Sequence, residues 1–319
     1  MSDINPLVSV CIPAYNHEKY IEQAIQSVID QTYENIELIV VDDGSKDGTW
    51  QKMCDLKEKC EKRFKNVVFM HQENQGLCTT LNRTIALANG KYLYFFASDD
   101  ASKPDAITLQ TAFLEQNPDY VLCVGDDEII DTDGKRVAWN DKRENVPLED
   151  GYQTFSAFLM SKKGTPQFTS SDFGTYETFA QGNYIVNGYL VRKDTIDEIG
   201  GYTTQAPLDE WYLMLQLSKR GKLKFIDKIL FSYRWHNDNC TKRKKMMKDM
   251  WRKTLLYEEK LLKEKYPNLL PILYEKNTKT KYLINLKPLL ALSKVKDIHY
   301  KQIKLTLFGL SITLHKKPI

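Results

Sequence analysis

Among the neighbouring acidic residues of this sequence, three widely spaced pairs could do chemistry: Asp42-Asp43, Asp99-Asp100 and Asp209-Glu210. Adjacent carboxylates repel each other unless a cation or hydrogen bonds compensate their charge. Mg²⁺ and Mn²⁺ take oxygen ligands and often bridge a few carboxylates to a substrate diphosphate. The pairs therefore predict a site for a cation and a nucleotide. The structural alternatives are a tight turn after Asp42 and acidic helix starts at the other two pairs.

A fourth polar cluster, Pro13-Ala14-Tyr15-Asn16, follows the first apolar run. The Tyr15 ring suits stacking on a nucleotide base, with the small Ala14 leaving room for it. Packing of Tyr15 on the next helix is the alternative. No GxGxxG motif follows this run, which argues against a dinucleotide oxidoreductase. No GxxxxGK[ST] motif occurs in the sequence, which argues against a P-loop NTPase.

Short apolar runs alternate with helical patterns through residue 125. The predicted strands are residues 7–12, 36–41, 67–70, 91–96 and 120–124, and the predicted helices are 20–29, 49–64, 77–88 and 105–115. Continuous apolar strands separated by helices indicate an α/β fold with a Rossmann-like, mostly parallel sheet flanked by helices. Ligands of such sheets bind beyond the carboxyl ends of the strands, where three of the four polar clusters fall.

The charge of the chain is unevenly distributed. Residues 241–319 contain 20 Lys and Arg against 6 Asp and Glu, whereas the rest contains 25 against 36. We predict a basic helical extension over 241–319, which could contact an anionic membrane surface, pack on the preceding domain or form an oligomer. Nucleic acid is not an expected partner, because the aromatic residues form no stacking platform.

Composition indicates a globular protein, with 42% hydrophobic and 27% charged residues. The six cysteines have no CxxC spacing, which argues against zinc and favours a reducing compartment. The N-terminal residues do not read as a signal peptide, and no apolar stretch is long enough to span a membrane. We expect a cytoplasmic protein that contacts the inner membrane at most peripherally.

Four motifs of the first 100 residues, taken together, resemble a known family. Residues 8–16, 40–45, 74–76 and 98–100 are similar, in order and spacing, to glycosyltransferase family 2 with the GT-A fold. The resemblance covers roughly residues 6–236. It implies a nucleotide-sugar-binding half (1–125) and an acceptor half (126–240) in a catalytic domain (1–240), followed by the extension (241–319).

The resemblance also implies roles for individual residues. Those that would hold the nucleotide sugar are Pro13, Ala14, Tyr15, Asp42, Asp43, Asn74, Gly76, Ser98, Asp99 and Asp100. Asp99 matches the last carboxylate of the DxD-type metal motif and would hold Mn²⁺ or Mg²⁺, with His236 near the metal or the diphosphate. Ala97 replaces the usual first Asp of that motif. Glu210 falls at the position of the general base, with Asp209 as the alternative.

The implied reaction is an inverting, non-processive transfer from a UDP- or dTDP-sugar to a hydroxyl of a glycan or lipid-linked saccharide, in capsule, lipopolysaccharide or other surface-glycan synthesis. The QxxRW signature of processive synthases is absent. One alternative is an inactive GT-A scaffold, because Ala97 replaces the usual first Asp of the metal motif. Another is a sugar nucleotidylyltransferase, which would normally carry a glycine- and lysine-rich loop after the first strand.

Overall fold

A computed structural model describes residues 5–185, 187–286, 290–307 and 310–318. The larger of its two sheets has the strand order β3-β2-β1-β4-β9-β6-β10-β5, with β7 and β8 attached to β6. Its strands are β1 (Val8–Ala14), β2 (Ile36–Asp42), β3 (Asn66–His71), β4 (Tyr92–Phe95), β5 (Ala101–Ser102), β6 (Tyr120–Ile130), β7 (Arg136–Trp139), β8 (Asn145–Val146), β9 (Tyr189–Arg192) and β10 (Lys222–Arg234).

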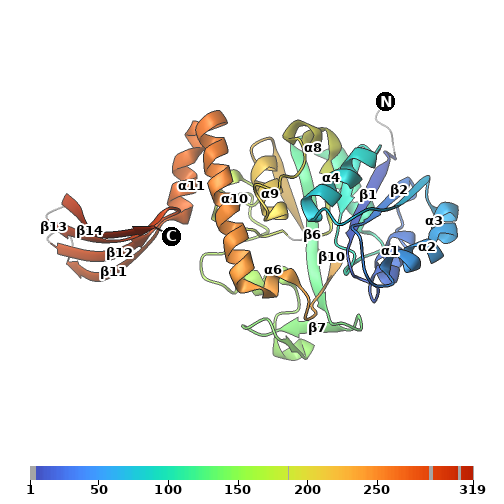
Figure 1. The fold of residues 1–319 in the computed structure, drawn as a ribbon, viewed down its shortest axis with the longest axis horizontal. Helices are drawn as coiled ribbons and strands as arrows, with labels where there is room; N and C mark the ends of the chain where they lie inside the picture. Colours follow the sequence, from blue (N-terminus) through green and yellow to red (C-terminus); the bar gives the residue numbers. More distant parts are fainter. Residues whose placement is uncertain (1–4, 186, 287–289, 308–309, 319) are drawn as a thin grey trace.

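The first four strands of this sheet run parallel, and β9 and β5 run antiparallel to their neighbours. Helices cover both faces (Figure 1). They are α1 (Ile21–Ile29), α2 (Thr49–Asp55), α3 (Lys57–Arg63), α4 (Leu77–Leu87), α5 (Ala106–Gln116), α6 (Phe155–Met160), α7 (Tyr176–Gln181), α8 (Lys193–Ile199) and α9 (Asp209–Leu217). The predicted α/β class and its mostly parallel sheet are confirmed.

Alternating side chains of β1 enter two separate cores. Val10 and Ile12 pack with the buried face of α1, whereas Cys11 packs on the opposite side with α4 and α9. Because successive residues of a strand point to opposite faces, a strand covered on both sides is apolar throughout. This explains why the strands read as continuous apolar runs.

Two helices of the extension pack on the second of these cores. They are α10 (Lys244–Lys265) and α11 (Leu270–Asn277), and Leu255, Leu262 and Leu273 are fully buried there. Trp251 of α10 stacks on Trp211 of α9, with ring centroids 6.0 Å apart and planes 10° from parallel. Packing on the preceding domain, one of the three predicted alternatives, is therefore observed. The division of the chain at residue 240 stays a prediction.

The expectation of a helical extension is wrong beyond residue 278. The chain there forms a second, antiparallel sheet of β11 (Lys279–Leu286), β12 (Leu290–Lys296), β13 (Tyr300–Leu307) and β14 (Leu310–Pro318). Apolar residues alternate with polar ones from 303 to 307 and from 310 to 314, which is the strand period. The many lysines elsewhere in the extension obscured this alternation. In Figure 1 this sheet lies beyond α10 and α11, away from the larger sheet.

The described residues contain no helix with both the length and the apolar character to cross a bilayer.

Candidate functional site

The predicted clusters meet at the carboxyl edge of the parallel strands. Ala14 at the end of β1 lies opposite Asp42 at the end of β2, which lies opposite His71 at the end of β3. Cys11 of β1 pairs with Phe95, the last residue of β4, so the 97–100 segment leaves the sheet at the same edge. The register thus places residues from distant parts of the chain along one rim.

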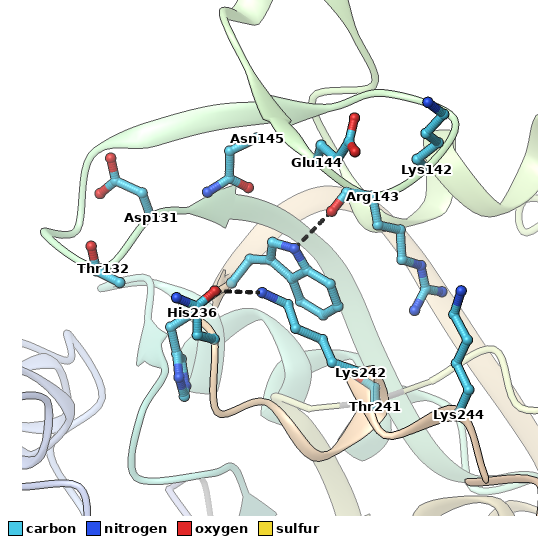
Figure 2. Close-up of a pocket in the computed structure, with 12 residues that line it drawn as sticks. Asp131, Thr132, Lys142, Arg143, Glu144, Asn145, His236, Thr241, Lys242 and Lys244 are labelled. Carbon is cyan, nitrogen blue, oxygen red and sulfur yellow. Dashed lines mark hydrogen bonds between the residues drawn. The ribbon is translucent and has the colours of Figure 1, made fainter.

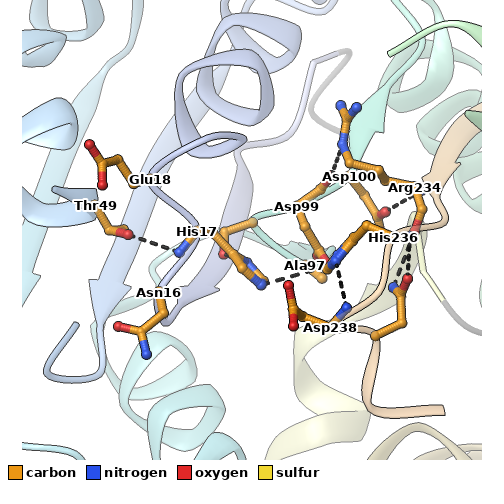
Figure 3. A network of polar contacts seen from close by, with 12 residues as sticks. Asn16, His17, Glu18, Thr49, Ala97, Asp99, Asp100, Arg234, His236 and Asp238 are labelled. Carbon is orange, nitrogen blue, oxygen red and sulfur yellow. Dashed lines mark hydrogen bonds and ion pairs between the residues drawn. The ribbon is translucent and has the colours of Figure 1, made fainter. Parts of the chain in front are cut away.

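His17, Asp99 and His236 form a compact cluster at this rim, which we call the His–Asp cluster. One potential ligand atom from each lies within 4.8 Å of the other two. Oδ2 of Asp99 is 2.9 Å from Nε2 of His236 and 3.7 Å from Nε2 of His17. Figure 3 shows the two histidines reaching Asp99 from separate segments of the chain.

Hydrogen bonds fix both rings of the cluster. Nδ1 of His17 lies 2.8 Å from the hydroxyl of the buried Ser98, which leaves Nε2 facing Asp99. Nδ1 of His236 accepts the Asp238 backbone N–H at 3.3 Å, so in this arrangement Nε2 carries the proton and donates it to Asp99. Burial raises the pKa of Asp99, but the His236 hydrogen bond and the His17 charge outweigh it and hold the pKa below its usual value.

The donor set of the cluster suits a divalent transition-metal ion. Imidazole nitrogens and a carboxylate oxygen are ligands of Mn²⁺ and its neighbours, whereas Mg²⁺ prefers oxygen alone. Metal binding at Nε2 of His236 requires the proton of that nitrogen to move to Nδ1 and the 3.3 Å contact with Asp238 to open. The residues therefore fit a cation after one change of tautomer.

Asp100 faces away from the cluster, into the protein. It is 1% exposed, and its carboxylate accepts hydrogen bonds from the Asn187 side chain at 2.5 Å and the Arg234 backbone N–H at 2.7 Å. Burial and the charge of Asp99 raise its pKa well above the usual value. Its contacts with the protein use both carboxylate oxygens, so it positions the segment that carries Asp99.

Arg234, at the end of β10, holds this segment from the other side. Its guanidinium donates to the backbone carbonyls of Asp99 at 2.7 Å and Asp131 at 2.8 Å and to the side chain of Gln23. The residue is 1% exposed. A guanidinium engaged in this way connects three segments around the cluster.

Asp43 binds the backbone of the loop before α4. Its carboxylate accepts the backbone N–H groups of Gln75 at 2.8 Å and Gly76 at 2.9 Å. Gly76, whose φ is +84°, begins α4 in a backbone region that suits glycine. Asp43 is only 4% exposed and orders the backbone on which Asn74 and Gly76 lie.

Asp42 is fully buried, with one oxygen 2.6 Å from Nδ1 of His71 and the other accepting the hydroxyl of Ser45. Gly44 follows at φ +73°, and a Cβ there would lie 2.8 Å from the backbone nitrogen of Asn74. Asp42, Gly44 and Ser45 thus form the tight turn that was the structural alternative for this segment. A nucleotide that contacts Asp42 or Asp43 would have to share their carboxylate oxygens with these protein hydrogen bonds.

Tyr15, in contrast, is open to solvent. Its side chain is 46% exposed, while Ala14 beside it is buried and Pro13 half-buried. Asn74 and Gly76 are also exposed at the same rim. A planar ring next to an ordered, exposed loop forms a surface on which a nucleotide base can stack.

Asp209 and Glu210 form the first turn of α9. Asp209 is 5% exposed and Glu210 is half-buried. Burial raises the pKa of both carboxyls, and the neighbouring Asp209 charge raises that of Glu210 well above its usual value. The structure thus holds at this helix start a carboxylate of increased basicity, as a general base requires.

Two contacts fix the start of α9. Thr254 of α10 accepts the Leu208 backbone N–H at 3.1 Å. Asn82 of α4 exchanges two hydrogen bonds with the Tyr202 backbone, at 2.8 and 2.9 Å, and so ties down the segment that leads to α9. The extension therefore helps to position the carboxylate pair.

The segment that leads to the carboxylate pair lies against the start of α4, where the Cys78 thiol donates to the Thr203 carbonyl at 3.7 Å. Burial raises the pKa of the Cys240 thiol to about 11, and the charges of Glu210, Asp209 and Asp99 add smaller contributions. Asp209 and Glu210 likewise act on Cys78 in the first turn of α4, which follows the loop that Asp43 orders. The register places Asp42, Asp43, Asp99 and Asp100 along the rim, and the carboxylate pair is connected to it through the start of α4.

His17 is the member of the site that the sequence reasoning missed. It directly follows the Pro13–Asn16 cluster at the end of β1. Extending that cluster by one residue would have included it, because the same strand-end rule covers the whole loop. The signal was present in the sequence, but a single histidine gave no reason to pair it with Asp99.

Comparison with known proteins agrees with this geometry. A mannosyltransferase from Pyrobaculum calidifontis, solved with GDP-Man and Mn²⁺, superposes with a TM-score of 0.60 at 16% identity over 85% of this chain and 69% of its own. Residues 1–349 of S. aureus TarS, solved with UDP-GlcNAc, superpose with a TM-score of 0.56 at 16% identity over 78% and 65%. These likenesses confirm the GT-A fold.

TuaG of Bacillus subtilis (strain 168), a glycosyltransferase assigned by name to teichuronic acid biosynthesis, is 40% identical over 114 residues, or 36% of this chain and 44% of TuaG. Matches to three curated relatives that are 37% to 40% identical span only 19% to 44% of their lengths. The family model for glycosyl transferase family 2 matches residues 9–173, more than half of the chain. With this match and the GT-A fold, the chain belongs to glycosyl transferase family 2.

Proposed function

We propose that this protein transfers a sugar from a nucleoside-diphosphate sugar to an acceptor hydroxyl, with inversion, in the synthesis of a bacterial surface polysaccharide. The observation that carries the proposal is the His–Asp cluster at the carboxyl rim of the sheet, where three potential metal ligands lie within 4.8 Å of one another. A base opposite a diphosphate site is what a single in-line displacement requires.

In this proposal Glu210 takes the proton of the acceptor hydroxyl. It is the more exposed member of its pair, and the raised pKa makes its ionised form a stronger base than an exposed glutamate. Asp209 stays buried and holds that pKa up through its charge. Because the base must be ionised, kcat/KM should rise with pH through the raised pKa of Glu210.

The other residues of the rim would hold the donor. Tyr15 stacks on the base, and the loop ordered by Asp43 supports the nucleotide. His17, Asp99 and His236 would hold Mn²⁺ in preference to Mg²⁺, because two of the three ligands are imidazoles. A cation bound there neutralises negative charge on the departing diphosphate.

For the donor and the acceptor we propose only a chemical class. Neighbouring structures contain UDP-GlcNAc and GDP-Man, and the family resemblance favours uridine or thymidine donors. The name of TuaG supports a surface polysaccharide as the product. A cytoplasmic location, peripheral membrane contact and an oligomer remain parts of the proposal.

Release of nucleoside diphosphate from UDP-, dTDP- and GDP-sugars, with Mn²⁺ and without it, tests the proposal. We expect Mn²⁺-dependent release from at least one donor. Glu210→Gln should bind that donor normally and lose turnover and the pH dependence. Glu177→Gln, an exposed glutamate in the first turn of α7, is the matched control and should be unaffected.

Each alternative predicts a different result. No release from any donor would favour an inactive scaffold, and pyrophosphate-dependent exchange would favour a nucleotidylyltransferase. Loss of turnover in Asp209→Asn, with Glu210→Gln still active, would move the base to Asp209.

A further inference from the structure

A cavity of 570 Å³ opens beside the His–Asp cluster, and the mechanism above makes no use of it. Its walls come from the β6–β7 turn, the β7–β8 hairpin and the segment from the end of β10 to the start of α10. His236 lines one part of it, so the cavity adjoins the cluster at this residue. In the view of Figure 2, Lys142, Arg143 and Lys244 lie on the side opposite His236.

The cavity is basic. Lys142, Arg143, Lys242 and Lys244 line it. Its two carboxylates are occupied elsewhere, because Asp131 accepts two backbone N–H groups of its own turn at 2.9 Å and Glu144 accepts the side-chain amide of Asn140 at 2.7 Å. Neither forms an ion pair with a cavity cation among the residues that the structure describes.

Arg143 is the most constrained of these cations. Its guanidinium carbon lies 4.8 Å from the ring centre of Phe158, 5.3 Å from that of Trp139 and 6.0 Å from that of Trp235. Its backbone has φ +62°, and its carbonyl accepts the indole N–H of Trp235 at 2.8 Å. A non-glycine residue in this backbone region marks a position that the surrounding structure holds in place.

No hydrogen bond or ion pair occupies this guanidinium within the described part of the chain. Burial lowers the pKa of Arg143, which means that its charge is incompletely solvated. A partly buried cation held on aromatic rings is costly unless an anion compensates it, and the planar fork of arginine matches the oxygens of a phosphate.

We propose that this cavity is the acceptor subsite and that Arg143 binds a phosphate group carried by the acceptor. The proposal deepens the transferase assignment and rests on it. Phosphate is favoured over carboxylate because four cations line the cavity, and a phosphate group can carry two negative charges. The acceptor class is thus a phosphate-bearing saccharide or polyol, either free or linked to a lipid.

Binding measurements on the full chain test the subsite without turnover. The probes are sn-glycerol 3-phosphate, phosphatidylcholine vesicles with and without phosphatidic acid, and UDP with Mn²⁺. The variants are Arg143→Met, which keeps an apolar stem on the rings, and the exposed Lys244→Met. Arg252→Met removes an exposed charge from α10 outside the cavity and is the control.

We expect glycerol phosphate to bind with a Kd of about 1–10 mM. Arg143→Met should weaken this binding at least about tenfold and Lys244→Met about threefold, with UDP affinity changed less than about twofold and Arg252→Met without effect. Arginine-dependent binding of the soluble probe assigns the site to phosphate as such. If only the vesicles with phosphatidic acid bind in an Arg143-dependent way, the site recognises a lipid-borne phosphate.

Two outcomes overturn the subsite. If neither probe binds in an Arg143-dependent way, the cavity does not recognise phosphate. If Arg143→Met and Lys244→Met weaken UDP binding as much as glycerol phosphate binding, the cavity serves the donor diphosphate. Failure of the transferase proposal is seen separately, as the absence of nucleoside diphosphate release from any sugar nucleotide.

Discussion

The buried ion pair between Lys219 and Glu258 joins α10 to the end of α9, and its removal should destabilise both helices. Nζ of Lys219 is 2.6 Å from Oε1 of Glu258, and the two side chains are 1% and 0% exposed. Glu258 also accepts the Tyr176 hydroxyl and the Gln216 amide, both at 2.8 Å. Glu258→Gln leaves a buried ammonium without its counter-charge.

The expected cost follows from these contacts. Breaking a buried pair by removing one partner costs about 3–5 kcal/mol. Glutamine retains one acceptor oxygen, and Lys219 keeps its 3.1 Å bond to Gln216 and lies over the rings of Tyr176 and Tyr266. We therefore expect Glu258→Gln to lower the free energy of unfolding by about 3 kcal/mol, the lower end of that range. At a urea m-value of about 3 kcal/mol/M this is a midpoint shift of about 1 M.

Urea unfolding followed by tryptophan fluorescence measures this shift, because Trp211 and Trp251 stack where α9 meets α10. Asp249→Asn, which removes an ion pair with Lys253 whose side chains are 53% and 58% exposed, is the control and should cost less than about 0.5 kcal/mol. Small and equal midpoint shifts in both variants would refute the argument that α10 shares one core with α9.

The pH dependence supplies a second check. Burial lowers the pKa of Lys219 below its ordinary 10.5, and Glu258 partly offsets this. The unfolded chain therefore binds more protons than the folded chain between the two pKa values, and stability rises with pH there. Removing Glu258 lowers the folded-state pKa further. The penalty of Glu258→Gln should thus shrink as pH rises from neutral toward 10.5; a constant penalty would contradict the buried charge.

Two further predictions concern the rim. His17→Gln should weaken Mn²⁺ binding, measured by calorimetry, at least about tenfold, whereas the control His71→Gln should not; equal affinities would exclude His17 from the metal site. Asp43→Asn leaves fewer acceptor sites for the Gln75 and Gly76 N–H groups and should cost about 1–3 kcal/mol, seen as a lower Tm, with weaker nucleotide binding. An unchanged Tm would show that this loop needs no carboxylate.

The sequence predicted the first half of the fold well because its signals there are local. Each strand from β1 to β4 is a short apolar run, and a polar cluster marks the end of β1, β2 and β4. The strand-end rule then places these clusters at one rim without knowledge of any contact.

Roles within the rim were harder to predict, since they depend on which way a side chain turns. Asp99 faces the two histidines, whereas its neighbour Asp100 faces Arg234 and Asn187, and adjacent letters do not distinguish them. Asp43 was predicted to bind the nucleotide, yet the backbone N–H groups of a loop 32 and 33 residues later occupy its oxygens. Such pairings exist only after the chain has folded.

Ala97 is the departure from the family pattern that most favours an inactive scaffold, and the His–Asp cluster offers a way to accommodate it. Alanine removes one carboxylate from the expected motif, but His17 and His236 approach Asp99 from two other segments. A divalent cation held by two neutral imidazoles and one carboxylate keeps a net charge of +1, whereas two carboxylates would cancel it. That residual charge would strengthen the attraction to the donor diphosphate. If the cluster holds a cation as proposed, the lost carboxylate would lower ligand charge and favour diphosphate binding, and a chain with Ala97 could retain activity.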